Sequence, residues 1–237
     1  MNIKVGILHF DQSIQLKMKM SQFTFIPILT FTCLVVVCCN YDEPKNMVVT
    51  AEERTKAESK TIENMQSAYK GEMNAIAKFE AFSKKAEEEG YHYIALLYNA
   101  VSAAEYIHAR NHKAVIEDSG SKVPTIKPEY KVKTTKENLA NDIKDEAYEA
   151  KKMYPDFLKT AETAENQIAY LSLTYAMKTE AKHKVFFEQV LADINSKTLK
   201  TSPSSYYVCP DCGNTYIASP KHCDFSLTEG EKFIKFQ

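Results

Sequence analysis

The chain has 237 residues, enough for one good-sized hydrophobic core and a small appended domain. Its 30 basic and 31 acidic residues nearly balance, so a polyanionic partner such as nucleic acid is not expected. Tryptophan is absent, glycine contributes only 6 residues, and Ala, Glu and Lys abound between positions 50 and 195, which favours helix over sheet. The predicted fold class is therefore all-α.

Residues 1–39 are predicted to be an export signal. Two lysines precede an almost uncharged apolar stretch at 23–37, which has the length of a signal-peptide core and is too short for a typical membrane-spanning helix. With Cys38 or Cys39 at its end, the segment resembles a bacterial lipoprotein signal, whose cysteine is lipidated. This resemblance implies a cell-envelope protein that faces the periplasm and meets the membrane only through its N-terminal anchor. An uncleaved signal anchor is the alternative.

A polar tether is predicted at 40–58, followed by a helical domain at 59–196. The first two helices are expected at 61–89, with Thr61 as the N-cap, and at 91–118. The apolar residues of each helix have helical spacing and so share one face, which is expected to be buried. Three polar residues lie on these apolar faces and not on the solvent-exposed faces: Glu72 in the first helix, and Glu105 and His108 in the second.

A connection that contains Gly and Pro leads to a second pair of helices. Thr134 and Glu137 form a capping box that opens the third helix, and Pro155 is expected to kink or break it. The fourth helix is expected at 165–194. The polar residues on the apolar stripes of this pair are Glu146 and Glu149 in the third helix, and Glu180 and His183 in the fourth.

The two helix pairs are copies of each other. Glu72, followed by a Glu-x-x-His pair, recurs 74 residues later as Glu146, again followed by a Glu-x-x-His pair. From Phe82 to Phe157 the offset is 75, so the second copy holds one extra residue between Glu146 and Phe157. One extra residue in a continuous helix predicts a π-bulge, a feature that often accompanies functional sites.

The duplicated acids and imidazoles predict a site for two metal ions. Residues at i and i+3 share a helix face, so each Glu-x-x-His pair presents two ligands about one turn apart. Buried carboxylates would cost several kcal/mol each if unpaired, whereas two divalent cations neutralise them and bind neutral imidazoles. The other histidines of the helices, His92 and His112, are predicted to lie on the surface. Tyr69 and Tyr98 are expected to pack in the core.

Four motifs resemble those of the rubrerythrins, over roughly residues 58–237. They are Tyr69-Lys-Gly-Glu72, Glu105-Tyr-Ile-His108, Glu180-Ala-Lys-His183 and the stretch from Asp145 to Pro155. The resemblance implies a ferritin-like four-helix bundle followed by a small rubredoxin-like or zinc-ribbon domain. It also implies two irons, one served by Glu72 and Glu105 and the other by Glu146 and Glu180. Glu105 and Glu180 would bridge them, and His108 and His183 would be terminal ligands.

The same resemblance implies an activity. The diferrous form would reduce hydrogen peroxide to water, with electrons from a rubredoxin- or reductase-type donor, in a homodimer. Glu149 would be a redox-dependent ligand that exchanges with a histidine, and Tyr154 lies close to the proposed site. Non-enzymatic iron binding or storage, and an interaction protein with a zinc knuckle, are the alternatives. A di-manganese catalase is another possible enzyme with such a site.

A linker is predicted at 197–205 and a cysteine-containing domain at 206–237. Cys209 and Cys212 form half of a rubredoxin or zinc-knuckle site, but the partner half reads Cys223-Asp-Phe-Ser226. Three outcomes are open: Ser226 is the fourth ligand of an iron, His222 completes a Cys3His site that suits zinc, or the site is degenerate and holds little metal.

Overall fold

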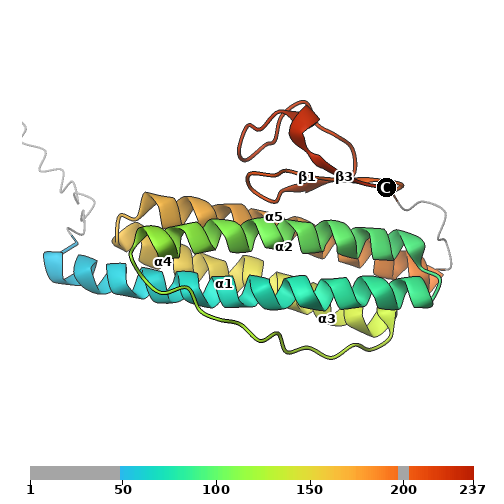
Figure 1. Ribbon diagram of the computed structural model, residues 1–237, viewed down its shortest axis with the longest axis horizontal. Helices are drawn as coiled ribbons and strands as arrows, with labels where there is room; N and C mark the ends of the chain where they lie inside the picture. The colour runs from blue at the N-terminus through green and yellow to red at the C-terminus, as the bar shows by residue number, and fades with distance from the viewer. Residues whose placement is uncertain (1–48, 197–202) are drawn as a thin grey trace, which may run out of the picture. The chain divides into compact units, whose positions relative to one another are not determined.

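The computed structural model describes residues 49–196 and 203–237 (Figure 1). The predicted export signal, with the lipidation candidates Cys38 and Cys39, lies outside these residues, as does most of the predicted linker. Within the described residues, no helix is both long and apolar enough to cross a membrane.

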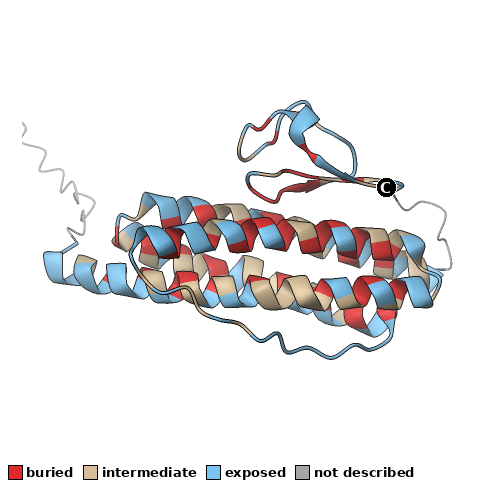
Figure 2. Cartoon of the chain, in the orientation of Figure 1, coloured by how far each residue is buried: buried red, intermediate tan, exposed pale blue. Residues whose placement is uncertain are grey.

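Four long helices form a bundle with buried inward faces (Figure 2). The first hairpin consists of α1 (Ala51–Glu88) and α2 (His92–Asp118), which pack against each other. The third long helix contains α3 (Thr135–Tyr148), the π-helix η1 (Glu149–Met153) and α4 (Tyr154–Thr163), and it packs against α5 (Gln167–Ser196). The predicted four-helix core is therefore present in this structure.

Helix α1 begins ten residues before the predicted start at Thr61. Thr50 is its N-cap, because the Thr50 hydroxyl accepts from the Glu53 amide while the Glu53 carboxylate accepts from the Thr50 amide. This capping box satisfies backbone donors that the first turn leaves unpaired. The prediction of a tether was therefore wrong for residues 51–58, which are helical, and Thr61 is a buried residue inside the helix.

The third long helix confirms two details of the sequence analysis. Thr134 and Glu137 form the predicted capping box of α3. The π-helix η1 lies where the repeat acquires its extra residue, and Pro155 is the second residue of α4, which follows η1. Proline lacks an N–H group, so it favours a break in the regular bonding pattern at this point.

The 119–134 connection joins the two hairpins without regular secondary structure and runs along α1 (Figure 1). Two hydrogen bonds attach it: Gln66 Nε2 donates to the Lys122 carbonyl over 2.8 Å, and the Glu129 amide donates to Asn74 Oδ1 over 2.7 Å.

The C-terminal domain is a three-stranded antiparallel sheet with strand order β2-β1-β3. Its strands are β1 (Tyr206–Val208), β2 (Thr215–Tyr216) and β3 (Ile234–Phe236), and a single 3-10 turn, η2 (Gly230–Lys232), precedes β3. The buried centre of this domain contains three cysteines and Phe233. The strands are too short to supply a large hydrophobic core, so a bound metal would contribute much of the stability of this domain.

Candidate metal centres

The two halves of the repeat meet in the middle of the bundle. The six core residues predicted as ligands are buried, and their ligand atoms form two groups of four that share two members. The first group contains Glu72 and His108, and the second contains Glu146 and His183. Glu105 and Glu180 belong to both groups, as expected of two metal positions linked by bridging carboxylates.

The distances within the cluster support bridging positions for Glu105 and Glu180. The Nδ1 atom of His108 lies 2.8 Å from Glu105 Oε2 and 3.0 Å from Glu180 Oε1. The Nδ1 atom of His183 lies 2.9 Å from Glu180 Oε2 and 3.2 Å from Glu105 Oε1. Each of these carboxylates therefore faces both histidines, with one oxygen directed to each ring.

The pKa values of the clustered side chains indicate an excess of buried negative charge, which a cation would neutralise. Burial and the charge of Glu105 raise the pKa of Glu72 well above its usual value, and burial with the charge of Glu180 does the same to the pKa of Glu146. Burial lowers the pKa of His183, but the charges of Glu105 and Glu180 and the hydrogen bonds to them together outweigh it and raise this pKa to about 9. Without metal, protons therefore compensate the carboxylates that cations would otherwise neutralise.

Some buried oxygen atoms of the cluster lack hydrogen bonds and are therefore available as ligands for metal ions. Among the described residues, Glu146 Oε2 is a buried side-chain atom without a hydrogen-bond partner, and Glu180 Oε1 has only its ion-pair contact with His108. Burying such atoms costs free energy unless another group satisfies them. Carboxylate oxygens and neutral imidazoles are the ligands that iron accepts in carboxylate-bridged sites, so the residues fit a pair of irons.

Glu149 lies beside the cluster and lines a small cavity. It belongs to neither ligand group, and it is the one predicted core ligand that is only partly buried. It lines a cavity of about 180 Å³, together with Gly71 and Lys78 of α1 and Tyr148 of α3. Burial and the charges of Glu180 and Glu105 raise the pKa of Glu149 to about 8. The cavity is small compared with the roughly 300 Å³ or more of pockets for drug-sized ligands.

Tyr154 and His112 lie on the Glu72 side of the cluster. The Tyr154 hydroxyl donates a hydrogen bond to Glu72 Oε1. His112 is completely buried, with its Nε2 atom 3.3 Å from the Tyr154 hydroxyl, so the prediction that it lies on the surface was wrong. Burial and the charge of His108 lower the pKa of His112 to about 3, which leaves its imidazole uncharged. A signal was available in the sequence, because His112 follows His108 by four residues on the same face.

The sequence analysis also missed a charged network near Glu146, a member of the second ligand group. Lys78 Nζ lies 3.0 Å from Asp142 Oδ1 and 3.2 Å from Asp145 Oδ2. The buried Tyr98 hydroxyl donates to Asp142 Oδ2 over 2.8 Å, so Tyr98 has a polar contact in addition to its core packing. Burial opposes the charge of Lys78, but Asp142 and Asp145 raise its pKa above the usual value. The network keeps a cation between the cavity and the hydrophobic core.

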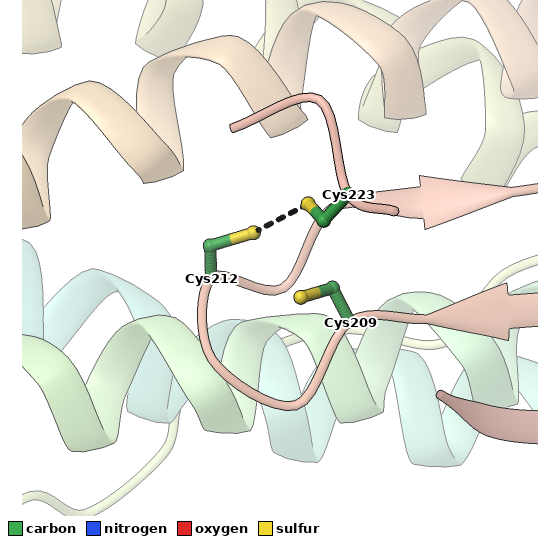
Figure 3. A group of neighbouring side chains, drawn as sticks. All are labelled: Cys209, Cys212 and Cys223. Atoms are coloured by element: carbon green, nitrogen blue, oxygen red, sulfur yellow. Dashed lines mark hydrogen bonds between the residues drawn. The ribbon is translucent and has the colours of Figure 1, made fainter. Parts of the chain in front are cut away.

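The second candidate centre lies in the C-terminal domain, where three cysteines face one another (Figure 3). The Sγ atoms of Cys212 and Cys223 are 3.4 Å apart, and Cys209 Sγ lies 3.2 Å from Ser226 Oγ. Three thiols and a hydroxyl thus converge, and thiolates bind iron and zinc strongly.

Ser226 occupies the position that Cys212 holds in the other half of this site. In the first loop, the Cys209 amide donates to the Asn214 carbonyl and the Gly213 amide donates to the Cys209 carbonyl. In the second loop, the Cys223 amide donates to the Thr228 carbonyl and the Leu227 amide donates to the Cys223 carbonyl. Gly213 and Leu227 have positive φ values of 79° and 62°. The second loop therefore repeats the fold of the first, with serine in place of cysteine.

The hydrogen bonds around Ser226 direct its oxygen towards the cysteines. Thr228 uses its one hydroxyl proton to donate to Asp211 Oδ2 over 2.6 Å. Ser226 must therefore donate in its 2.6 Å bond to Thr228, which leaves its lone pairs free on the cysteine side. The ring of His222, the other candidate ligand, is not among the clustered groups, and this residue is exposed.

The first cysteine loop contacts the helices that carry the core histidines. Arg110 Nη2 donates to the Pro210 carbonyl over 2.8 Å, and His183 Nε2 lies 3.1 Å from Thr215 Oγ1. A Cβ atom added at Gly213 would lie only 2.5 Å from His108 Nε2, so the backbone passes close to this ring. Both histidines thus face the carboxylates with Nδ1 and the C-terminal domain with Nε2.

Comparisons with known proteins agree with this architecture. A family model described as Rubrerythrin matches residues 63–191. Nigerythrin of Nitratidesulfovibrio vulgaris is 32% identical over 170 residues, which cover 71% of this chain and 81% of the relative. Rubrerythrin-2 of Clostridium acetobutylicum is 29% identical over 178 residues, which cover 74% and 96%. A structure of fully reduced, all-ferrous nigerythrin matches with a TM-score of 0.67 at 30% identity, over 74% of this chain and 86% of that chain.

The bundle and its paired ligand groups define a ferritin-like di-iron protein with a small rubredoxin-like domain. The chain belongs to the rubrerythrin family. The buried carboxylate and histidine cluster is the di-iron site of this family, and the three-cysteine cluster fits its rubredoxin-like iron site.

Proposed function

We propose that this protein is a di-iron peroxidase that reduces hydrogen peroxide to water. The observation that carries the proposal is a small cavity lined by Glu149, whose carboxylate interacts electrostatically with Glu180 and Glu105 of the buried cluster. The cavity has room for hydrogen peroxide and a few water molecules, and its polar side chains suit a hydrogen-bonding substrate. Glu72, Glu105, His108, Glu146, Glu180 and His183 would hold the two irons.

The proposed reaction consumes two electrons and two protons: H2O2 + 2 H⁺ + 2 e⁻ gives two water molecules as the O–O bond breaks. The bound iron pair would supply the two electrons. Glu149 lines the cavity in which hydrogen peroxide would bind, and it would act as a carboxylate that can approach or leave the metal pair. Tyr154 would orient Glu72 through its hydrogen bond, and the buried helix faces would limit access of bulk water.

Electrons would reach the bundle through the C-terminal domain. We propose Cys209, Cys212, Cys223 and Ser226 as the ligands of one iron there, because the two loops repeat each other and the Ser226 lone pairs face the sulfurs. The contact between Thr215 and His183 is a short route from this domain to the core. A rubredoxin- or reductase-type protein would reduce the domain from outside. The homodimer stays a prediction.

The test is anaerobic loading of the full chain with Fe(II), followed by one equivalent of hydrogen peroxide. Oxidation of two core irons per peroxide, and turnover with a reductant, are expected. His183→Ala should abolish both, whereas His92→Ala, which alters an exposed histidine of α2, should retain them. Uptake of many more than two irons without turnover would indicate storage instead, and full activity of His183→Ala would exclude this site.

The location of the protein is a separate proposal. We infer export and lipidation at Cys38 or Cys39 from the N-terminal sequence alone. Mass spectrometry of the native N-terminus is the test: a lipid-modified cysteine as the first residue is expected, and an unmodified Met1 would refute the proposal.

A further inference from the structure

Four buried side chains form a hydrogen-bonded chain that ends on Glu72. Ser172 Oγ lies 2.8 Å from Nδ1 of His112, Nε2 of His112 lies 3.3 Å from the Tyr154 hydroxyl, and this hydroxyl donates to Glu72 Oε1. The four residues come from α5, α2, α4 and α1 respectively, so each long helix of the bundle contributes one. Such a chain fixes the four helices relative to one another at the metal site.

The direction of these hydrogen bonds follows from the number of protons. Tyr154 has one hydroxyl proton, and it donates this proton to Glu72. The Tyr154 oxygen can therefore only accept from His112, so the proton of the His112 ring belongs on Nε2. Nδ1 is then the acceptor, and the Ser172 hydroxyl donates to it. All donors thus point from Ser172 towards Glu72.

The other half of the repeat provides an internal comparison. With the offset of 75 that relates His108 to His183, His112 corresponds to Phe187 and Tyr154 corresponds to Phe79. The two phenylalanine rings lie 5.7 Å apart, close to the 6.0 Å between the rings of His112 and Tyr154. The counterpart of Glu72 is Glu146, whose Oε2 atom has no hydrogen-bond partner among the described residues. An apolar pair on one side of the site is thus replaced by a polar pair on the other.

We propose that His112 is a positioning residue of the di-iron site: it directs the Tyr154 hydroxyl onto Glu72 and so fixes this carboxylate for the metal. The proposal rests on the metal site of the proposed function but not on its peroxidase activity. Groups that hold the ligands of a metal typically contribute about 10-fold or more to its affinity. His112 should therefore affect iron binding although it is not one of the predicted ligands.

The first test determines the proton position directly. Nitrogen NMR of the full chain, labelled with ¹⁵N-histidine and loaded with diamagnetic Zn(II) so that Glu72 is ionised, distinguishes the two neutral ring forms. The His112 signal, assigned by its loss in His112→Gln, is expected to show the proton on Nε2. A proton on Nδ1 would overturn the proposal, whether or not the protein binds iron.

The second test measures Fe(II) affinity anaerobically in four variants. His112→Leu, which removes the donor, and Tyr154→Phe should each weaken binding to the core about 10-fold. The double variant should bind no more weakly than either single variant, since both break the same chain. His112→Gln keeps an N–H donor and should restore affinity to within about threefold of the wild type. His92→Leu is the matched control on the exposed end of α2.

Wild-type affinity in His112→Leu, or additive losses in the double variant, would overturn the proposal. If His112→Leu does not fold, the proposal is still tested by two results. One is the NMR result, and the other is the difference in Fe(II) affinity between Tyr154→Phe and His112→Gln. A wild-type protein that binds two irons but does not reduce peroxide would refute the proposed function and leave this inference intact.

Discussion

At the scale of single residues, the serine in the C-terminal site has the clearest consequence. Ser226 lies where the first loop has Cys212, and its oxygen is a harder donor than sulfur. If iron binding displaces the hydroxyl proton and Ser226 binds as an alkoxide, this donor favours ferric over ferrous iron, so the reduction potential of this site should be lower than that of a four-cysteine site.

Ser226→Cys is therefore expected to raise the reduction potential of the C-terminal iron and to give the visible spectrum of an iron tetrathiolate. Potentiometric titration of the full chain, with the core site followed separately, measures the change. Ser219→Cys, which alters an exposed serine of the same domain, is the control. An unchanged potential and spectrum would show that Ser226 is not a ligand.

Leu227 bears a conformational cost that its counterpart Gly213 avoids. Its φ of 62° lies in the left-handed region, where a side chain costs roughly 1–2 kcal/mol, and the side chain is 76% exposed. Leu227→Gly should therefore stabilise the C-terminal domain by roughly 1 kcal/mol. Loss of the absorbance of its iron with increasing denaturant reports this change. A lower midpoint would show that contacts of the leucine outweigh the strain.

At the scale of elements, the π-helix η1 determines which side chains face the site together. Glu149 begins this segment and Tyr154 follows it, so the extra residue sets the angle between them. Each residue of a regular helix turns the chain by about 100°. A regular helix over the same stretch would not present Glu149 at the cavity and Tyr154 at Glu72.

Deletion of the exposed Lys151 is expected to convert η1 into α-helix. The six core ligands lie outside this segment, so two irons should still bind. Peroxide-driven oxidation should slow by at least about tenfold, because Glu149 or Tyr154 turns away from the site. Stopped-flow spectroscopy of the diferrous protein measures the rate, and Lys151→Ala controls for loss of the side chain. A rate equal to that of the control would contradict this role of the π-helix.

At the scale of the whole molecule, protons and metal ions compete for one buried cluster. Below pH 8 Glu149 is protonated, and below pH 9 His183 is protonated as well, as their pKa values of about 8 and about 9 require. A bound cation displaces these protons, so higher pH favours binding.

Fe(II) affinity of the metal-free bundle is therefore expected to rise between pH 6 and pH 9, by about tenfold per pH unit for each displaced proton. Anaerobic calorimetry in two buffers of different ionisation heat counts the protons released. The slope should flatten once the pH exceeds the pKa of His183. An affinity that does not change with pH would mean that the cluster is already deprotonated without metal.

Most helices and core metal ligands could be predicted from the sequence, because the repeat and the apolar stripes show which helix faces are buried. Helical spacing placed Glu72 and Glu105 on buried faces, and the change of offset located η1. It failed where the signal depends on tertiary contacts. Thr50 caps a turn that precedes the bundle core, and His112 is buried because Tyr154 and Ser172, distant in sequence, satisfy its ring. The direction of the Ser226 hydroxyl likewise depends on Thr228 and Asp211.

The 119–134 connection gives the metal site a property that the helices alone would lack. Each hairpin supplies half of the ligands, so the two irons cross-link the hairpins, and without them the acids of both halves crowd together. The connection, bonded to α1 at Gln66 and Asn74, keeps the hairpins at a high effective concentration when the metals leave. When iron binds again, it would bring together two hairpins of one chain that are already held near each other. The segment would therefore help the metal-free bundle to bind iron again.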